Sequence, residues 1–457
     1  MSLAGFRRAV SNNLNTLIKS SYQRPSIGRY LHLQTSRMSK HIPSLVARES
    51  KPSIWVEFTT LAAECKAVNL GQGFPDSPMP EFMGEILKDV SEHPERTDWH
   101  QYTRGYGHPR LVKVLAEFYS KLLGVNIKAN EEILITVGAY LSLYYSMLGW
   151  LNPGDEVIIF EPAYDSYVPQ VKMAGAVPIA IALDLPENPK TSADYAVNFE
   201  KIRARITDKT KMIILNNPNN PSGKLYTRAE LEGIARIAEE FDLLVVADEV
   251  YEWHIFPGSE MVRFASLPNM YERTITIGSA GKAFSATGWK LGWSMGPARL
   301  LEPLKAIHQN CVFTCPTPTQ EGVARAFERE LKLYNQGNRK DSYLFTKMAE
   351  ELLPKRNRIA ENLRNAGMNP ILPEAGYFII ADMDHIDGPF RNTTEDELDF
   401  RFVRWLTREK GLATIPPSAF YSPENKKGND HFIRLCFFKK DETLDAAVKI
   451  LNQFNKP

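Results

Sequence analysis

The stretch TITIGSAGKAFSATGWKLGWS, residues 274–294, joins two short apolar runs through a loop rich in glycine and serine. The runs Thr274–Ile277 and Leu291–Ser294 have the apolar density of strands buried on both faces of a parallel sheet. The loop between them carries two lysines, Lys282 and Lys290. Open α/β sheets bind ligands in the loops at the carboxyl ends of parallel strands, so the stretch predicts an α/β fold with a site at Lys282.

The same alternation of β-rich runs and helical patterns extends back to about residue 130. Four further strands are expected at Ile133–Val137, Glu156–Phe160, Met212–Leu215 and Leu243–Ala247. The capping box Thr227-Arg-Ala-Glu230 predicts a helix that starts after Thr227 and ends before Phe241. The alternation of strands and helices predicts a doubly wound α/β domain.

The sequence pattern changes after about residue 335, where charged helical segments around 345–365 precede an apolar run at Ile371–Met383. A last strand is expected at His431–Phe438. We interpret this part as a second, smaller α+β domain, joined to the first near Asn335–Arg339.

Composition excludes several classes of protein. The 457 residues contain 55 Lys and Arg against 54 Asp and Glu, so the basic excess of a nucleic-acid binder is missing. The sequence has no apolar run of about 18 residues, so no membrane-spanning helix is expected, and Tyr140–Leu151 is interpreted as a buried helix. Four cysteines in so long a chain predict neither a disulfide framework nor, at these spacings, a metal site.

The first 48 residues differ from the rest because they contain eight basic residues and no acidic residue. An arginine-rich, serine-rich, acid-free N-terminus is typical of a mitochondrial transit peptide. The alternative is a disordered basic tail. Translation from Met38 would give a cytosolic form.

Five further motifs accompany the Lys282 segment. They are Asn69–Asp76, Gln101–Pro109, Asn217–Gly223, Ala247–Trp253 and Phe432–Cys436. With these motifs in order, the chain from Trp55 to its C-terminus resembles the class I aminotransferases of fold type I, which use pyridoxal 5′-phosphate. Within that class it is most similar to the kynurenine aminotransferases, also called glutamine transaminase K or cysteine-S-conjugate β-lyases.

The resemblance implies a large doubly wound mixed-sheet domain and a smaller α+β domain. It divides the chain into a basic targeting segment (1–47), an arm with part of the small domain (48–75), the cofactor-binding domain (76–335) and the rest of the small domain (336–457). It implies transfer of an amino group from kynurenine, glutamine or another aromatic or sulfur amino acid to a 2-oxo acid, with β-lyase side activity. Neither a nucleic acid nor a membrane is expected as a partner.

The resemblance also assigns roles to residues of the site. Lys282 would bind the cofactor covalently and carry the catalytic proton. The other cofactor-binding residues would be Gly138, Ala139, Tyr164, Asn220, Asp248, Tyr251, Ser279 and Lys290, with Tyr102 from the neighbouring subunit. The substrate-binding residues would be Trp55, Gly73, Tyr140, Asn220 and Arg434, with Phe313 from the neighbouring subunit. The expected assembly is therefore a homodimer with shared active sites.

Several of these residues also have a chemistry of their own. Lys282 lies close to a second cation, which favours the neutral amine that forms a Schiff base; as an alternative, both lysines are solvated. Asp248 ends an apolar strand, where a buried carboxylate needs a cation such as a protonated pyridine; alternatively it caps a helix. Arg434 lies between two apolar residues and would pair with a substrate carboxylate or form an internal salt bridge. Gly138 and Ala139 open a helix whose N-terminus suits a phosphate, although such turns commonly use glycine.

One departure and two alternatives stay open. Some members of the family have His after the pocket Phe, whereas this chain has Thr314 after Phe313, so the donor preference is not fixed by the motifs. Another lyase or synthase that uses the same cofactor has the same motifs. A catalytically silent binding protein on this fold is the second alternative, because a fold does not fix a function.

Overall fold

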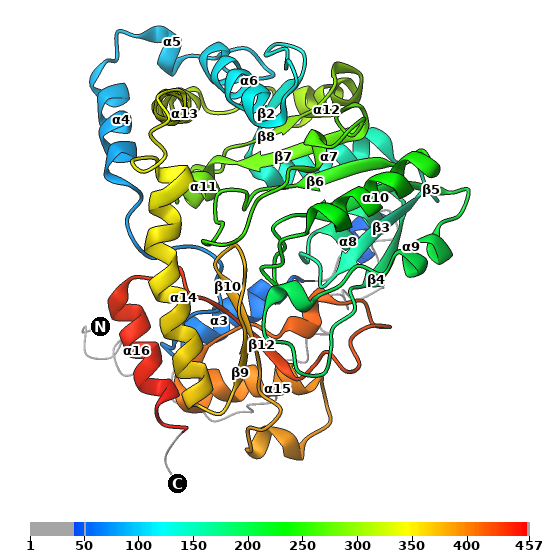
Figure 1. The fold of residues 1–457 in the computed structure, drawn as a ribbon, viewed down its shortest axis with the longest axis vertical. Helices are drawn as coiled ribbons and strands as arrows, with labels where there is room; N and C mark the ends of the chain where they lie inside the picture. Colours follow the sequence, from blue (N-terminus) through cyan, green and yellow to red (C-terminus); the bar gives the residue numbers. More distant parts are fainter. Residues whose placement is uncertain (1–40, 50–51, 455–457) are drawn as a thin grey trace, which may run out of the picture. The chain divides into compact units, whose positions relative to one another are not determined.

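The computed structural model describes residues 41–49 and 52–454 (Figure 1). The chain divides into two compact units, Met1–Lys51 and Pro52–Pro457. In the first unit the structure describes one short helix, α2 (Leu45–Glu49). Residues 1–40 of the predicted targeting segment lie outside the described residues. All that follows concerns the second unit.

The large sheet contains seven strands in the order β2-β8-β7-β6-β5-β3-β4 (Figure 1). The strands are β2 (Ile133–Thr136), β3 (Glu156–Glu161), β4 (Val177–Ala182), β5 (Thr210–Asn216), β6 (Leu244–Asp248), β7 (Thr274–Ser279) and β8 (Gly292–Met295). Only β8 runs antiparallel to its neighbours, β2 and β7. The six predicted strands and the mixed sheet are confirmed. Strand β4 was missed: it is a half-buried edge strand that contains Pro178, a residue tolerated at sheet edges.

Helices cover both faces of the large sheet. Helices α7 (Gly138–Trp150), α8 (Tyr167–Met173) and α12 (Ala298–Cys311) pack on one face, and α9 (Phe199–Arg205) and α10 (Arg228–Glu240) pack on the other. Because side chains alternate along a strand, Ile159 and Ile214 lie in the core under α7, whereas Ile158 and Ile213 lie in the core under α10. The predicted capping box is confirmed at the start of α10, where the Thr227 hydroxyl accepts from the Glu230 amide.

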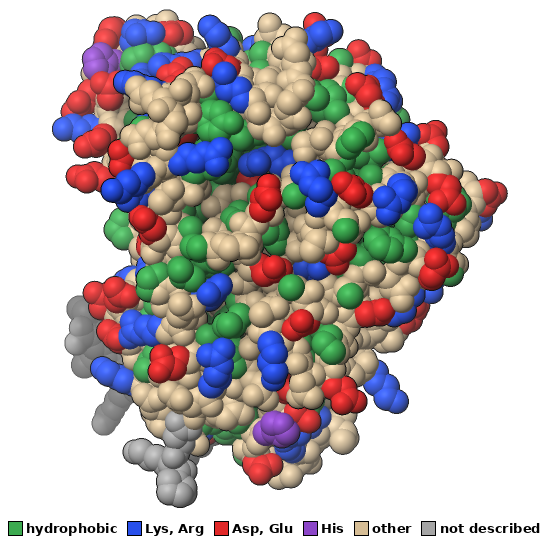
Figure 2. Space-filling view, viewed as in Figure 1, with side chains coloured by type: hydrophobic (Ala, Val, Ile, Leu, Met, Phe, Trp, Pro, Cys, Tyr) green, Lys and Arg blue, Asp and Glu red, His purple; other side chains and the backbone are tan. Residues whose placement is uncertain are grey.

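A third group of helices packs beside β2 and β8. It consists of α4 (Glu81–Glu92), α5 (Thr97–His100), α6 (Pro109–Leu123) and α13 (Thr317–Asn335), with α13 in contact with the other three. The short helix α11 (Ala280–Ala283) follows β7 directly. On the face shown in Figure 2, basic and acidic side chains are interspersed.

The remaining elements form two small sheets with their own helices. Strands β9 (Asn369–Ile371), β10 (Phe378–Asp382) and β12 (Phe432–Cys436) form an antiparallel sheet in the order β12-β10-β9, and β1 (Val68–Asn69) pairs with β11 (Leu412–Ala413). The helices are α3 (Ile54–Glu64), α14 (Met348–Asn365), α15 (Leu398–Trp405) and α16 (Asp441–Leu451). In Figure 1, α14 leads from the large sheet to this region. The predicted C-terminal strand is confirmed as β12.

Within the described residues, no helix combines the length and the apolar composition needed to cross a bilayer. The same residues contain no cluster of three or more His, Cys, Asp or Glu side chains arranged to hold a metal ion.

Candidate active site

A cavity of about 390 Å³ lies at the carboxyl edge of the large sheet. Strands β2, β5, β6 and β7 all end there, and strand register places Asn216 beside Asp248 and Ser279 beside Gly292. The predicted site residues that line the cavity are Trp55, Gly73, Gly138, Ala139, Tyr140, Tyr164, Asn220, Asp248, Tyr251, Ser279, Lys282, Lys290 and Arg434. The structure therefore brings together every predicted residue of the chain's own site.

Lys282 lies on α11, just past the end of β7, with its amine in the cavity. Its Nζ donates to the hydroxyl of Tyr377 at 2.6 Å and to the carbonyl oxygen of Gly73 at 3.3 Å. Burial, reinforced by the cations of Arg434 and Lys290, lowers the pKa of Lys282 to about 8. A neutral amine is therefore accessible near physiological pH, as a Schiff-base lysine requires.

Asp248 ends strand β6 with only 4% of its surface exposed. Its carboxylate accepts from the Tyr167 hydroxyl at 2.6 Å and from the Val250 amide at 3.4 Å. Burial raises the pKa of Asp248 to about 6. No ion pair links it to a side chain of the described residues, so a cation in the cavity is its natural partner.

Donors for an anion gather around the start of α7. Helix α7 begins at Gly138, two residues earlier than the sequence suggested, and Val137 provides no side-chain cap for its free N–H groups. A Cβ atom on Gly292 would lie 2.4 Å from the Ala139 nitrogen, so only glycine lets β8 approach this helix start. Ser279 and Lys290 line the same cavity and add a hydroxyl and an ammonium group.

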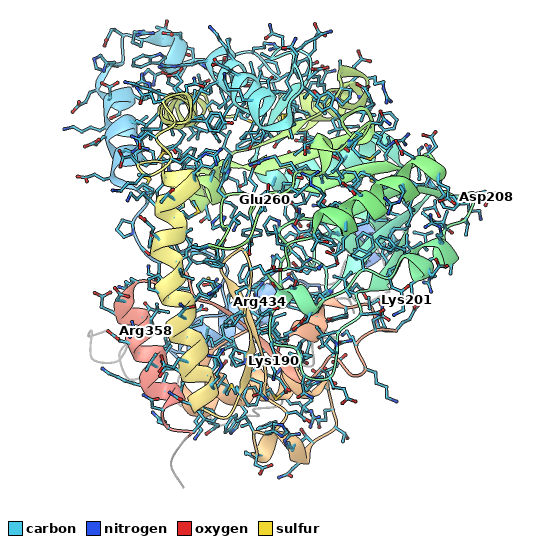
Figure 3. All side chains as sticks on the ribbon, viewed as in Figure 1. Lys190, Lys201, Asp208, Glu260, Arg358 and Arg434 are labelled. Carbon is cyan, nitrogen blue, oxygen red and sulfur yellow. The ribbon has the colours of Figure 1, made fainter. Side chains whose placement is uncertain are left out.

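Arg434 lies in β12, is fully buried and occupies the interior of the molecule (Figure 3). Its Nη1 donates to the Asn220 side chain at 3.0 Å, and its Nη2 donates to the Gly71 carbonyl at 2.8 Å. The guanidinium carbon lies 4.1 Å from the ring centroid of Phe378 and 5.1 Å from that of Trp55.

An internal salt bridge, the alternative role for Arg434, is not formed with any described carboxylate. Among the described residues Nε of Arg434 also has no hydrogen-bond partner. A buried guanidinium with a free donor, flanked by aromatic rings, is suited to a substrate carboxylate.

Tyr102 and Phe313 are the two predicted residues outside the cavity. Their rings contact each other edge to face at 5.6 Å between centroids. They are 85% and 58% exposed, respectively. Their proposed contribution to a neighbouring subunit stays a prediction.

Several polar or aromatic residues that line or support the cavity were not predicted as site residues, among them Asn216, Tyr167, Tyr377 and Phe378. Asn216 ends β5 beside Asp248, so the rule that ligands bind at strand ends could have found it. Tyr167 lies three residues after Tyr164, and its hydroxyl donates to Asp248. Tyr377 and Phe378 carry no comparable signal, because buried aromatic residues at a strand start are usually core residues.

Residues 66–451 match the family model of the aminotransferases of class I and II. The chain belongs to this family. It is 46% identical over 407 residues to kynurenine–oxoglutarate transaminase 3 of Rattus norvegicus, covering 88% of each chain. It is 41% identical to kynurenine–oxoglutarate transaminase 1 of Homo sapiens, covering 88% of this chain and 95% of the relative.

Solved structures show the same relationship. Bna3p from Saccharomyces cerevisiae superimposes with a TM-score of 0.83 at 30% identity, covering 91% of this chain and 99% of that one. YbdL from Escherichia coli, which has a methionine aminotransferase function, gives a TM-score of 0.77 at 29% identity, covering 90% and 100%. The fold is that of the fold type I aminotransferases.

The enzyme is therefore a pyridoxal-phosphate-dependent aminotransferase, and its cavity fits that cofactor. Lys282 would bind it covalently, Asp248 would accept from its protonated ring nitrogen, and Tyr164 lines the cavity where a ring can stack. Lys290, Ser279 and the start of α7 would hold the phosphate. When bound, the cofactor serves as the electron sink that stabilises a carbanion at the substrate Cα.

Proposed function

We propose that this aminotransferase takes the amino group from kynurenine, glutamine or another aromatic or sulfur amino acid and passes it to a 2-oxo acid. The observation that carries the proposal is the buried Arg434 between Trp55 and Phe378, which offers one carboxylate site beside flat apolar walls. The names of the relatives, kynurenine–oxoglutarate transaminases, support this donor and acceptor pair.

The chain's own residues divide the work. Arg434 and Asn220 bind the α-carboxylate of the donor and orient its Cα–H bond. As a neutral amine, Lys282 would take the proton from the donor's Cα and, as an ammonium, would give it to C4′, acting as base and then as acid. The aromatic rings of Trp55 and Phe378 line the cavity beside Arg434.

A β-lyase side activity follows from the same proton abstraction. If Lys282 removes the Cα proton of a donor with a good leaving group on Cβ, the electron pair of the broken C–H bond can expel that group. Cysteine S-conjugates are such donors. We propose this side activity for the same site.

A panel of donors and acceptors, measured as steady-state kcat/KM, tests the proposal. Kynurenine, glutamine, phenylalanine and methionine should be used with 2-oxoglutarate and with aromatic oxo acids, and a cysteine S-conjugate should release its thiol. A ranking led by acidic or small aliphatic donors would contradict the proposed specificity. Turnover confined to elimination would identify a lyase, and bound cofactor that no amino acid converts would identify a silent binding protein.

We also propose a homodimer with shared active sites. Exposed aromatic rings support it: Tyr102 and Phe313 form a pair, and Tyr140 and Phe74 are exposed at the cavity itself. Aromatic residues are enriched at protein interfaces. A two-fold interface gives both sites the same contribution.

Mixing variants tests this assembly. In a heterodimer of Lys282→Ala and Tyr102→Phe chains, one site collects both lesions and the other has neither. If both parents are strongly impaired, the mixture should exceed the activity of each. Heterodimers that form without any recovery would mean that Tyr102 serves its own chain.

For location, we propose import into mitochondria with cleavage before about Met38, and a cytosolic form that starts at Met38. The composition of residues 1–40 supports this proposal. Residues 1–40 fused to a fluorescent reporter should direct it to mitochondria, and a reporter fused to residues 38–60 should stay in the cytosol. A wholly cytosolic 1–40 fusion would refute the import.

A further inference from the structure

Tyr377, Lys282 and the Gly73 carbonyl are linked to one another by three hydrogen bonds. The Tyr377 hydroxyl accepts from Lys282 Nζ at 2.6 Å and donates to the Gly73 carbonyl at 2.9 Å. The same Nζ also donates to Gly73 at 3.3 Å. Since the hydroxyl proton is engaged by the carbonyl, the lone pairs of the Tyr377 oxygen are the atoms that face the amine.

This arrangement suits a neutral amine that acts as a base. A neutral amine has two N–H bonds and one lone pair. The two oxygen acceptors, from Tyr377 and Gly73, satisfy the two N–H bonds and leave the lone pair free to take a proton. They also fix the direction of that lone pair, which an amine on a flexible four-carbon chain would otherwise not hold.

The Tyr377 hydroxyl is held in place by a packed surround. The residue is only 1% exposed, and its ring contacts Tyr251 and His254 edge to face, both at 5.2 Å between centroids. Neither ring nitrogen of buried His254 has a hydrogen-bond partner among the described residues. Burial and the charge of Lys282 lower the pKa of His254 to about 3, so His254 adds no positive charge to those of Arg434 and Lys290 near the amine.

We propose that Tyr377 is a positioning residue for the proton transfer, which it assists by holding the Lys282 amine while that amine is not bonded to the cofactor. The proton leaves Cα, becomes the third N–H of Lys282 as an ammonium, and is then given to C4′, which restores the amine. Tyr377 gains and loses no proton. The inference rests on the aminotransferase reaction of the family and not on the donor proposed above.

The first test compares Tyr377→Phe with Tyr226→Phe as a matched control. Tyr226 is equally buried, and its hydroxyl has no partner within the described part of the chain. The measurement is single-turnover conversion of the holoenzyme by the best donor, with hydrogen or deuterium at Cα.

In Tyr377→Phe the rate should fall about 10-fold, as expected for the loss of one hydrogen bond. The deuterium isotope effect should rise, and the donor concentration at half-maximal rate should stay unchanged. Tyr226→Phe should match the wild type in all three respects.

The second test needs no turnover. In holoenzyme loaded with pyridoxamine 5′-phosphate Lys282 is a free amine, and its pH-dependent acetylation can be followed by mass spectrometry. Loss of the Tyr377 oxygen, an acceptor that stabilises the ammonium form, should shift the midpoint to lower pH. Fluorotyrosine at position 377, a weaker acceptor, should shift the acetylation midpoint less. This variant replaces Tyr377→Phe if the latter binds the cofactor poorly.

Two results would overturn the inference. One is a Tyr377→Phe enzyme with the wild-type rate, isotope effect and acetylation midpoint. The other is a variant that changes only in stability or in donor affinity, as a merely structural residue would. A wrong donor assignment would appear instead in the wild-type enzyme, as weak conversion of kynurenine and glutamine. The variants can then still be compared with the wild type by using any amino acid that the enzyme does convert.

Discussion

The two halves of the cavity are built in different ways. The cofactor half takes its residues from the ends of neighbouring strands of one sheet, so the register of β5, β6 and β7 fixes Asn216, Asp248 and Ser279 relative to one another. The substrate half takes Arg434 and Phe378 from a second sheet, Trp55 from α3 and Gly73 from the loop after β1. One half is thus fixed by a single sheet, and the other by the packing of separate segments.

The halves also differ in the sign of the buried charge that lacks a partner. On the cofactor side, Asp248 is a buried carboxylate without an ion-pair partner among the described residues. On the substrate side, Arg434 is a buried guanidinium with a free Nε within the same residues. Each half therefore requires a ligand group of opposite charge, a cationic ring nitrogen in one and a carboxylate in the other. Lys282 stands between them.

The largest effect on activity is expected for Lys282, which lies in the cavity with Asp248 and Arg434. Lys282→Ala removes the amine that moves the proton, so kcat should fall by at least about 10³-fold. Lys201→Ala, which changes a lysine at the periphery of the molecule, is the control and should leave kcat unchanged (Figure 3). Steady-state assays with saturating cofactor check this. Full turnover by Lys282→Ala would remove the residue from the mechanism.

The cofactor half can be tested through the pH dependence of stability. The pKa of Asp248 is raised from 3.8 to about 6 in the folded protein, so its stabilising contribution is complete below about pH 4 and is lost as the pH rises to 6. The loss amounts to about 3 kcal/mol of unfolding free energy. Asp248→Asn should lack it, and denaturant unfolding of cofactor-free protein at pH 4 and pH 7 measures the difference.

Other acids titrate in the same window, so the quantity that matters is the difference between wild type and variant. Lys282 does not interfere, because its pKa is lowered from 10.5 to about 8 and its contribution changes only above that pH. Parallel pH curves for wild type and Asp248→Asn would show that this carboxylate is solvated in the absence of the cofactor.

The substrate half is tested by Arg434→Lys. A lysine keeps the charge but loses the planar fork, and one charge-assisted hydrogen bond contributes about 2 kcal/mol. We expect kcat/KM for the donor to fall about 30-fold, mainly through KM, with cofactor affinity unchanged. Arg358→Lys, on the outer helix α14, is the matched control (Figure 3). A fall in kcat alone would place Arg434 in the chemical step.

The same difference explains what the sequence could predict. Asp248 and Lys282 stand at the ends of apolar runs, so their strands and their place at the sheet edge follow from local patterns. Trp55, Gly73 and Arg434 were assigned by resemblance, because nothing in their local sequence shows that segments hundreds of residues apart meet. Tyr377 and Phe378 were missed for that reason. Their role depends on a neighbour, Lys282 or Arg434, that lies far away in the chain.

The smallest expected effect lies in neither half. The capping box of α10 was predicted from four residues, and the structure shows both of its hydrogen bonds, from the Glu230 amide to Thr227 and from the Thr227 amide to Glu230. Thr227→Ala should lower the unfolding free energy by about 1 kcal/mol. Thr227→Ser, which keeps a hydroxyl acceptor, should lose much less unfolding free energy.

Neither variant should change kcat/KM, because α10 covers the face of the sheet and contributes no residue to the cavity. Denaturant unfolding and steady-state assays on the same preparations check both points. A loss of activity without a loss of stability would mean that α10 influences the cavity through the sheet. The structure argues against this, because the two faces of β5 and β6 pack into separate cores.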